Sequence, residues 1–229
     1  MSSLEPRPKT GRPPVYCDKA CRQRAYRLRC RRQRRNVAGD VAPIRVCYAD
    51  PPYPGKARKY YRDESSYGGE VDHVALVSSL MEGYPDGWAL STSREALRWI
   101  LPLCPATAHL CPWVKPIPPR GRTHGLHSTW EALIVVGGRQ CAPGMRDWLL
   151  AKPAVGGGTL MGRKPLAYCA FLFDALGLLP GDELVDLFPG TGIVGRAWAN
   201  LSGASASFRR PRPPATIRRR CRARPASLR

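Results

Sequence analysis

Short apolar runs and amphipathic stretches alternate through the middle of the chain. Apolar runs rich in strand-forming residues lie at 44–49, 88–93, 108–114, 131–137 and 183–188. Helical spacing marks three stretches, 71–82, 93–103 and 165–178. Ser93 can cap the second, and Pro165 stands at the start of the third. This alternation predicts an α/β fold with a mainly parallel sheet and helices on both faces. Ligands of such sheets gather at the carboxyl ends of the strands, so the residues after each apolar run are candidates for a site.

The run 183–188 leads into a glycine turn, Pro189-Gly190-Thr191-Gly192, before a helix that starts near Ile193. Glycine lets a backbone approach a ligand closely, and a helix N-terminus offers unpaired N–H groups. Together with Gly195 the turn matches G-x-G-x-x-G, but a dinucleotide site needs an acidic residue about 20 positions later. No acidic residue follows Gly195, and no Gly-Lys-Ser/Thr marks a P-loop. A cofactor turn and a plain strand-to-helix turn both remain open.

The run 44–49 is followed by Asp50-Pro51-Pro52-Tyr53. Two prolines stiffen this corner and remove backbone donors, which leaves carbonyl oxygens as acceptors. A carboxylate and a carbonyl held together suit an exocyclic amino group, and Tyr53 offers a ring face to a planar base. The alternative is a proline-rich turn that only ends a strand.

Charge separates the chain into a body and two arms. The 229 residues carry a formal net charge of +20, yet residues 36–202 hold 16 basic and 15 acidic residues. Residues 1–35 hold 12 Lys+Arg against 2 acids, and residues 203–229 hold 9 Arg and no acid. We therefore expect a basic arm with an Arg-rich helix (1–40), a globular domain (41–202) and a disordered Arg/Pro-rich tail (203–229). Both arms are typical of polyanion binding, although a solvated tail would have the same composition.

The first arm has helical order, since Asp18 can cap a helix whose apolar stripe starts at Cys17 and Cys21. Its other faces carry arginines that we expect to contact phosphates, among them Arg22, Arg24, Arg27 and Arg31. The two cysteines would supply half of a structural zinc site, so zinc stays open and no metal site is predicted. The chain has no apolar run of about 18 residues and no signal peptide, and its 9 cysteines fit a reducing compartment, which predicts a cytoplasmic protein without a membrane span.

Six ordered segments between 44 and 200 resemble S-adenosylmethionine (SAM)-dependent amino-methyltransferases, and most of all phage-type bacterial DNA adenine methyltransferases. They are YADPPYPG, DHVALVSSL, GWALSTS, WEALIVVGGR, GRKP and ELVDLFPGTGIVGRAW. The resemblance implies a Rossmann-like sheet and a permuted order, in which the catalytic DPPY precedes the cofactor glycine motif. It also implies SAM as cofactor, DNA as partner, and methyl transfer to N6 of a flipped adenine. Defence by restriction-modification, phage self-protection and regulation are all compatible roles.

Residue by residue, the resemblance assigns the catalytic corner to Asp50, Pro51, Pro52 and Tyr53. Asp50 and the Pro51 carbonyl would hold the N6 amino group, while Tyr53 stacks on the base. The cofactor would be bound by Lys164, Pro165, Asp186, Phe188, Gly190, Thr191 and Gly192.

Two features depart from that family. Further strands and an acidic residue for the cofactor ribose commonly follow the glycine motif, whereas the sequence after Asn200 offers neither. The base-reading region is short, and positions 115–129 supply Lys115, Arg120, Arg122, His124 and His127 either to read base edges or to solvate a loop. Transfer to N4 of cytosine, an RNA substrate, and a catalytically incomplete nucleic-acid-binding relative therefore stay open, with a nicotinamide oxidoreductase as the weakest alternative.

Overall fold

The computed structural model describes residues 41–56, 70–116, 127–142, 144–154 and 163–203. Several sequence predictions fall outside these ranges. They concern the basic arm and tail, and the residues Cys17, Cys21, Arg22, Arg24, Arg27, Arg31, Arg120 and Arg122.

Six strands form one sheet in the order β5-β3-β4-β2-β1-β6. Their bounds are β1 Arg45–Ala49, β2 Gly87–Ser93, β3 His109–Val114, β4 Trp130–Gly137, β5 Leu149–Leu150 and β6 Glu183–Asp186. Strand β1 is central and pairs in parallel with β2 and β6. Only β4 runs against the other described strands, because it pairs antiparallel with both β2 and β3. The mainly parallel α/β sheet predicted from the sequence is confirmed, with this one reversal added.

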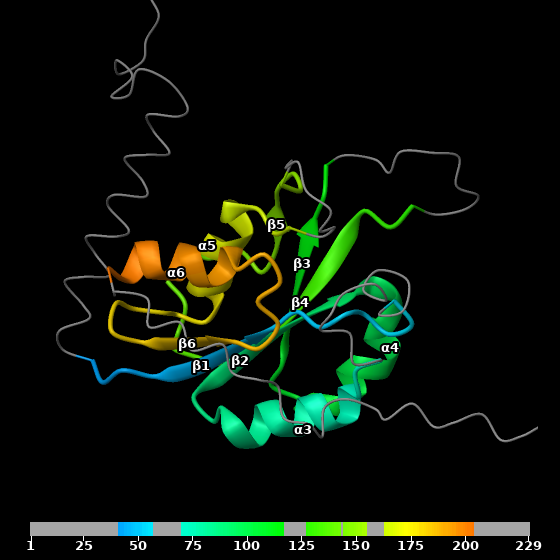
Figure 1. Cartoon of the computed structure of the whole chain (residues 1–229), viewed down its shortest axis with the longest axis horizontal. Coiled ribbons are helices and arrows are strands. Elements are labelled where there is room, and N and C mark those ends of the chain that lie inside the picture. The colour runs from blue at the N-terminus through cyan, green and yellow to red at the C-terminus, as the bar shows by residue number, and fades with distance from the viewer. Residues whose placement is uncertain (1–40, 57–69, 117–126, 143, 155–162, 204–229) are drawn as a thin grey trace, which may run out of the picture.

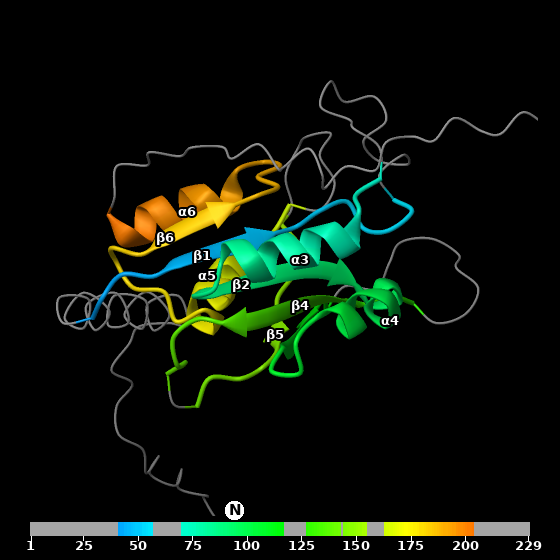
Figure 2. The same ribbon diagram turned by 90° about the horizontal axis from the view of Figure 1, so that it is seen from below.

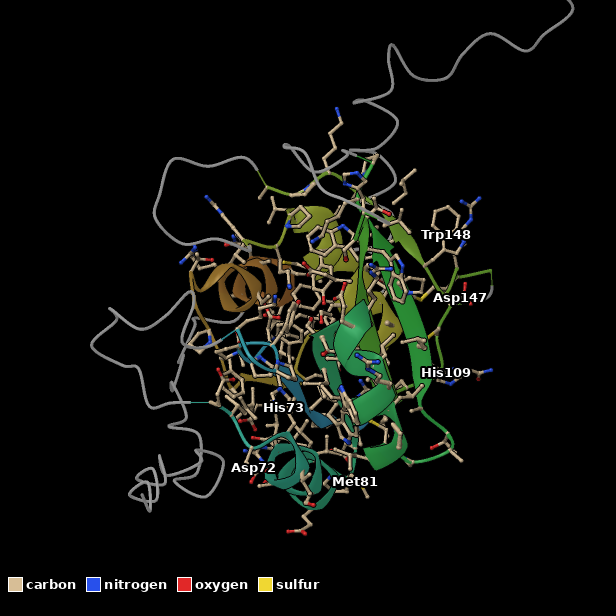
Figure 3. All side chains as sticks on the ribbon, turned by 90° about the vertical axis from the view of Figure 1, so that its right-hand side faces the viewer. Asp72, His73, Met81, His109, Asp147 and Trp148 are labelled. Atoms are coloured by element: carbon tan, nitrogen blue, oxygen red, sulfur yellow. The ribbon has the colours of Figure 1, made fainter. Side chains whose placement is uncertain are left out.

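Helices cover both faces of the sheet, as the alternation predicted. Helix α3 (His73–Gly83) lies on one face, and α5 (Leu166–Ala175) and α6 (Ile193–Ser202) lie on the other (Figure 1). Seen from below, α3 runs alongside β1 and β2 (Figure 2). Side chains on α3 and on the β3–β5 side of the sheet lie at opposite sides of the molecule, marked by Met81 and Trp148 (Figure 3). No helix in the described ranges is long and apolar enough to cross a membrane.

The period-2 pattern of the strands divides the core between the two faces. On β1, Val46 and Tyr48 pack into the cluster under α5 and α6, whereas Cys47 and Ala49 pack into the cluster under α3. All four are almost fully buried, as expected for a strand with helices above and below it. This packing fixes where β1 ends, and hence where Asp50 begins.

Three local predictions differ from the structure. The stretch after Ser93 forms short turns, η1 (Arg94–Ala96), α4 (Leu97–Ile100) and η2 (Leu101–Leu103), and the Ser93 side chain makes no cap hydrogen bond. Pro102 lacks an N–H and so cannot extend α4. Helix α5 ends at Ala175 rather than at 178, because Gly177 takes a positive φ of 62°. Strand β5 was not predicted, because its two residues are too few to show the alternation of apolar and polar positions that marks a strand.

The amino ends of the strands are tied together by a single buried carboxylate, Asp182. It accepts hydrogen bonds from the Ile44 N–H at 2.9 Å, from the Leu179 N–H at 2.6 Å and from both terminal nitrogens of Arg139. Arg139 Nη2 also donates to the carbonyl of Ala42 at 2.6 Å. This network joins the chain before β1, the turn before β6 and the chain after β4.

Candidate functional site

A cavity of about 690 Å³ opens where β1 and β6 end. The two strands are neighbours in the sheet, with Tyr48 opposite Asp186. Both turns singled out in the sequence therefore leave the sheet side by side, at the edge where α/β sheets bind ligands. The cavity is lined by Asp50-Pro51-Pro52-Tyr53 on one side and by Asp186 and Phe188-Pro189-Gly190-Thr191 on the other.

Lys164 lines this cavity with only 5% of its side chain exposed. Its ammonium is 3.2 Å from Asp50 Oδ1 and 3.1 Å from Asp50 Oδ2. It also donates to Glu131 Oε2 at 3.1 Å and lies 3.4 Å from the Tyr53 hydroxyl. Lys164 precedes α5, whose first turn bonds to the Pro165 carbonyl, so the helix start aims the lysine into the site.

Glu131 joins the remaining polar groups. Its Oε2 accepts from the Tyr53 hydroxyl at 2.9 Å, and its Oε1 is paired with the ammonium of Lys115. Lys115 follows β3 directly and lies 4.8 Å from the centre of the Trp113 ring. The result is a chain of alternating charges, Asp50, Lys164, Glu131 and Lys115, two negative and two positive.

Aromatic rings surround the buried ammonium of Lys164. Its nitrogen lies 5.9, 5.5 and 5.3 Å from the ring centres of Tyr53, Trp113 and Tyr168, within cation–π range. Behind them, the Ser91 hydroxyl is hydrogen-bonded to the hydroxyls of both Tyr48 and Tyr168. Planar rings beside convergent polar groups are a suitable lining for a flat, polar ligand.

Burial and mutual charge set the protonation of this network. Burial raises the pKa of Asp50, and Glu131 raises it further, against the opposing effect of Lys164. Burial alone would lower the pKa of Lys164, but Asp50, Tyr53 and Glu131 outweigh it and hold that pKa well above its usual range. For Glu131, Lys164 and Lys115 overcome the effect of burial and lower the pKa to about 2. At neutral pH Lys164 is therefore a cation and Glu131 an anion.

The glycine turn presents a second carboxylate to the cavity. Asp186 is buried, and among the described contacts its carboxylate accepts one hydrogen bond, from the Phe188 N–H at 3.2 Å. Burial and the nearby charge of Asp50 raise the pKa of Asp186 to about 7. Gly190 and Gly192 have φ values of 46° and 71°, and the Gly192 carbonyl accepts from Arg196 in the first turn of α6. The two glycines thus let the backbone turn tightly from β6 into α6.

The structure brings together most of the residues that the sequence assigned to a site. Asp50, Pro51, Pro52, Tyr53, Lys164, Asp186, Phe188, Gly190 and Thr191 line the cavity. Pro165 and Gly192 are not among the lining residues; each stands at the N-cap of a helix, before α5 and α6. Lys164 was expected on the cofactor side, whereas its ammonium contacts the DPPY corner.

Sequence reasoning missed Glu131, Trp113 and Tyr168, and left Lys115 as a possible solvated residue. Glu131 stands at the start of a strand, not after its end. Because β4 is antiparallel, that start lies at the same edge as the carboxyl ends of β1 and β2, with Glu131 opposite Ser93. A signal was available in the Glu131 position itself, a charged residue heading an otherwise apolar run.

No family model and no curated protein matches the chain. Solved structures that resemble it include two crystal structures of M1.HpyAVI, one of them a complex with SAM. Their TM-scores are 0.47 and 0.45, each at 18% sequence identity and covering 77% of this chain, with 85% and 84% of the respective M1.HpyAVI chains covered. Likeness at this level carries no argument about function, which rests on the residues of the cavity.

Proposed function

We propose that the protein transfers a methyl group from SAM to N6 of adenine in DNA. The observation that carries this proposal is the meeting of two turns in one cavity. Asp50-Pro51-Pro52-Tyr53 and Asp186–Thr191 leave adjacent parallel strands and line the same space. A stiff acceptor corner beside an acidic glycine turn suits an amino group on one side and a charged cofactor on the other.

The acceptor corner would bind the amino group that is methylated. Asp50 and the Pro51 carbonyl can each accept one N–H of an exocyclic amine, while a ring such as Tyr53 can stack on the base. The amine is a weak nucleophile because its lone pair is delocalised into the purine ring. Hydrogen bonds to two fixed acceptors favour the geometry in which the lone pair points out of the ring, and fixed acceptors need no reorganisation during the reaction.

SAM fits the other side of the cavity. Asp186 is a buried carboxylate with one backbone donor among its described contacts, which suits an ammonium group. Phe188, Gly190 and Thr191 line the same wall, while Gly192 and Pro165 shape the backbone behind it. When bound, SAM supplies an electrophilic methyl group on a sulfonium.

The amino nitrogen gains a methyl group and must lose one proton. Lys164 holds its proton because its pKa is raised well above the usual range, and so does the Tyr53 phenol, whose pKa burial also raises. Asp50 is the carboxylate in contact with this position, and its raised pKa makes it a better proton acceptor than an exposed aspartate. We assign it both the hydrogen bond and the proton.

A nucleic acid is the substrate class that the charge distribution favours, and we propose DNA. The basic excess lies outside residues 36–202, as expected when affinity comes from phosphates and chemistry from a neutral body. A base inside a duplex cannot enter a cavity of this kind, so the target nucleotide must be flipped out. Lys56 and Arg163, which also line the cavity, would meet the backbone of the flipped nucleotide.

The proposal is tested by replacing Asp50 with alanine. We expect Asp50→Ala to reduce methyl transfer from labelled SAM to unmethylated DNA by at least ~1,000-fold. The variant loses both the hydrogen-bond acceptor for the amino group and the group that takes its proton. Calorimetry should show SAM affinity within about threefold of the parent, because the glycine turn is untouched. Asp147→Ala serves as control, because Asp147 is exposed, lies just before β5 and does not line the cavity. Undiminished transfer by Asp50→Ala would contradict the assignment.

Digestion of the product to nucleosides separates the alternatives. Label on N4 of cytosine, or transfer to RNA in place of DNA, would support methyl transfer from SAM and contradict adenine in DNA as its substrate. Failure to bind SAM at millimolar concentration would favour a nucleic-acid-binding protein without this activity. Binding of a nicotinamide cofactor instead would favour an oxidoreductase.

A further inference from the structure

We propose that Glu131 is a positioning residue that draws Lys164 away from Asp50, so that Asp50 can accept the amino group of the substrate. This inference rests on the proposed function, because it concerns the same cavity. It starts from one geometric fact. The Lys164 ammonium lies between two carboxylates, 3.1 Å from the nearest oxygen of each.

Lys164 and a substrate amino group compete for the same acceptor. Both oxygens of Asp50 are within 3.2 Å of the Lys164 ammonium, so the ammonium occupies the acceptor that an exocyclic amine would also need. An ammonium held by Asp50 alone would be hard to displace, since a buried ion pair that loses one partner leaves the other charge unpaired. A second carboxylate removes this difficulty, because Lys164 keeps a full counter-charge while it yields its place on Asp50.

Glu131 is built to be that second carboxylate. Its Oε1 is paired with Lys115 and its Oε2 accepts from Tyr53, so the carboxylate is held in place from two sides. It stands on a strand, between Ser93 of β2 and Trp113 of β3, and not on a loop. Residues on strands hold their position better than residues on loops. Lys164 can therefore move toward Glu131 while Glu131 stays fixed.

Glu131 is also coupled to the ring of Tyr53. The Tyr53 hydroxyl donates to Glu131 Oε2, the oxygen that also receives Lys164. A shift of the ammonium toward Glu131 thus occurs beside the ring proposed to stack on the base. One carboxylate would set the position of both the cation and the ring.

The charge of Glu131 has a measurable effect on Asp50. The groups that act on the Asp50 carboxylate are Lys164, Glu131 and Lys115, with Tyr48, Tyr53, Tyr168 and Asp186 nearby. Glu131 is the anion among them that raises the Asp50 pKa. Removal of its charge should therefore lower that pKa, both directly and because Lys164 would rest on Asp50 alone.

The experiment compares Glu131→Gln, which removes the charge, with Glu131→Asp, which keeps it. The titration of Asp50 is followed by carboxyl carbon-13 NMR in the full chain, with its signal identified by its loss in Asp50→Asn. We expect Glu131→Gln to move the Asp50 titration down by about one pH unit, and Glu131→Asp to leave it within about 0.3 units. Glu183→Gln, at the other end of the sheet in an exposed pair with Arg45, is the matched control.

Methyl transfer is measured on the same variants. We expect Glu131→Gln to lower kcat at least ~10-fold with KM for SAM within about twofold, and Glu131→Asp to recover most of that loss. An unshifted Asp50 titration in Glu131→Gln would overturn the proposal. So would a Glu131→Asp variant as inactive as Glu131→Gln, because shape and not charge would then matter. The NMR result needs no activity, so a parent protein that transfers no methyl would refute the proposed function and leave this test standing.

Discussion

Two buried aspartates at the ends of strand β6 differ in the number of hydrogen bonds that they accept. Asp182, just before the strand, accepts from two backbone N–H groups and from both terminal nitrogens of Arg139. Asp186, the last residue of the strand, has one backbone N–H, that of Phe188, among its described contacts. Both are buried, with exposed fractions of 7% and 2%. They differ in their partners, because Asp182 is paired with Arg139 whereas Asp186 lies near the like charge of Asp50.

The difference separates a structural carboxylate, Asp182, from a candidate ligand-binding carboxylate, Asp186. At Asp182 the acceptor capacity is filled, and the carboxylate locks together three segments at the amino ends of the strands. At Asp186 the capacity is largely unused by the protein, and burial raises the pKa of the carboxyl to about 7. A buried carboxyl with a perturbed pKa and few protein donors, in a cavity, is a candidate for a ligand site. Asp50 also differs from Asp182, because its described partner is the ammonium of Lys164 and no backbone N–H.

Replacement of Asp182 should have the largest effect. We expect Asp182→Asn to lower the free energy of unfolding by ~3 kcal/mol, because the Arg139 guanidinium loses its buried counter-ion. Urea denaturation followed by circular dichroism measures this.

Asp186→Asn is the matched variant at the other end of β6. We expect it to change the free energy of unfolding by less than about 1 kcal/mol at pH 7, since the amide removes a charge that burial disfavours. Equal destabilisation by Asp182→Asn and Asp186→Asn would contradict the distinction between a structural and a ligand-binding carboxylate.

The second prediction concerns the pH dependence of SAM binding. Asp186 has a pKa of about 7, so its carboxylate is mostly neutral at pH 5.5 and mostly ionised at pH 7.5. The ionised form attracts the cofactor ammonium, so affinity should rise by about 10-fold between these two pH values. Calorimetry at both pH values measures the change. Asp186→Asn should flatten the dependence, and a parent protein with no pH dependence would exclude Asp186 from the SAM site.

The third and smallest effect compares the two ends of α6. Gly192 and Gly203 flank this helix with nearly the same left-handed backbone, at φ values of 71° and 72°. Alanine at either position should cost ~1 kcal/mol of stability, because a Cβ is disfavoured there.

Only Gly192→Ala, at the end of α6 next to the cavity, should weaken the binding of SAM. A Cβ on Gly192 would lie 3.0 Å from Arg196 Nη1, at the start of the helix that faces the cavity. We expect Gly192→Ala to weaken SAM binding about threefold and Gly203→Ala to leave it unchanged. Equal losses of affinity would indicate a general effect on the helix.

The sequence predicted much of this arrangement, because the signals were strong and local. Apolar runs of strand length located β1, β2, β3, β4 and β6, and helical spacing located α3 and α5. The turns at Asp50 and Asp186 were identified as candidates because each follows an apolar run, and the sheet order places them next to each other. Turn residues with fixed backbone preferences, such as proline and glycine, carry such information in the sequence itself.

The charge network was harder to predict, because it depends on strand direction. Glu131 lies in the site because β4 runs antiparallel to its neighbours. Lys115 follows β3, the strand on the far side of β4 from β2, and pairs with Glu131 there. Lys164 was assigned to the cofactor by resemblance, while its contact with Asp50 spans 114 residues of chain. Contacts of that separation follow from tertiary packing and leave no periodic signal.

The most direct test of the central claim is transfer of radiolabelled methyl from SAM to unmethylated DNA by the full chain, followed by nucleoside analysis. The paired turns at Asp50 and Asp186 predict that the label appears in N6-methyl-2′-deoxyadenosine from the DNA, that it disappears in Asp50→Ala, and that it persists in Asp147→Ala. Absence of label in DNA under conditions where calorimetry shows SAM bound would contradict the claim.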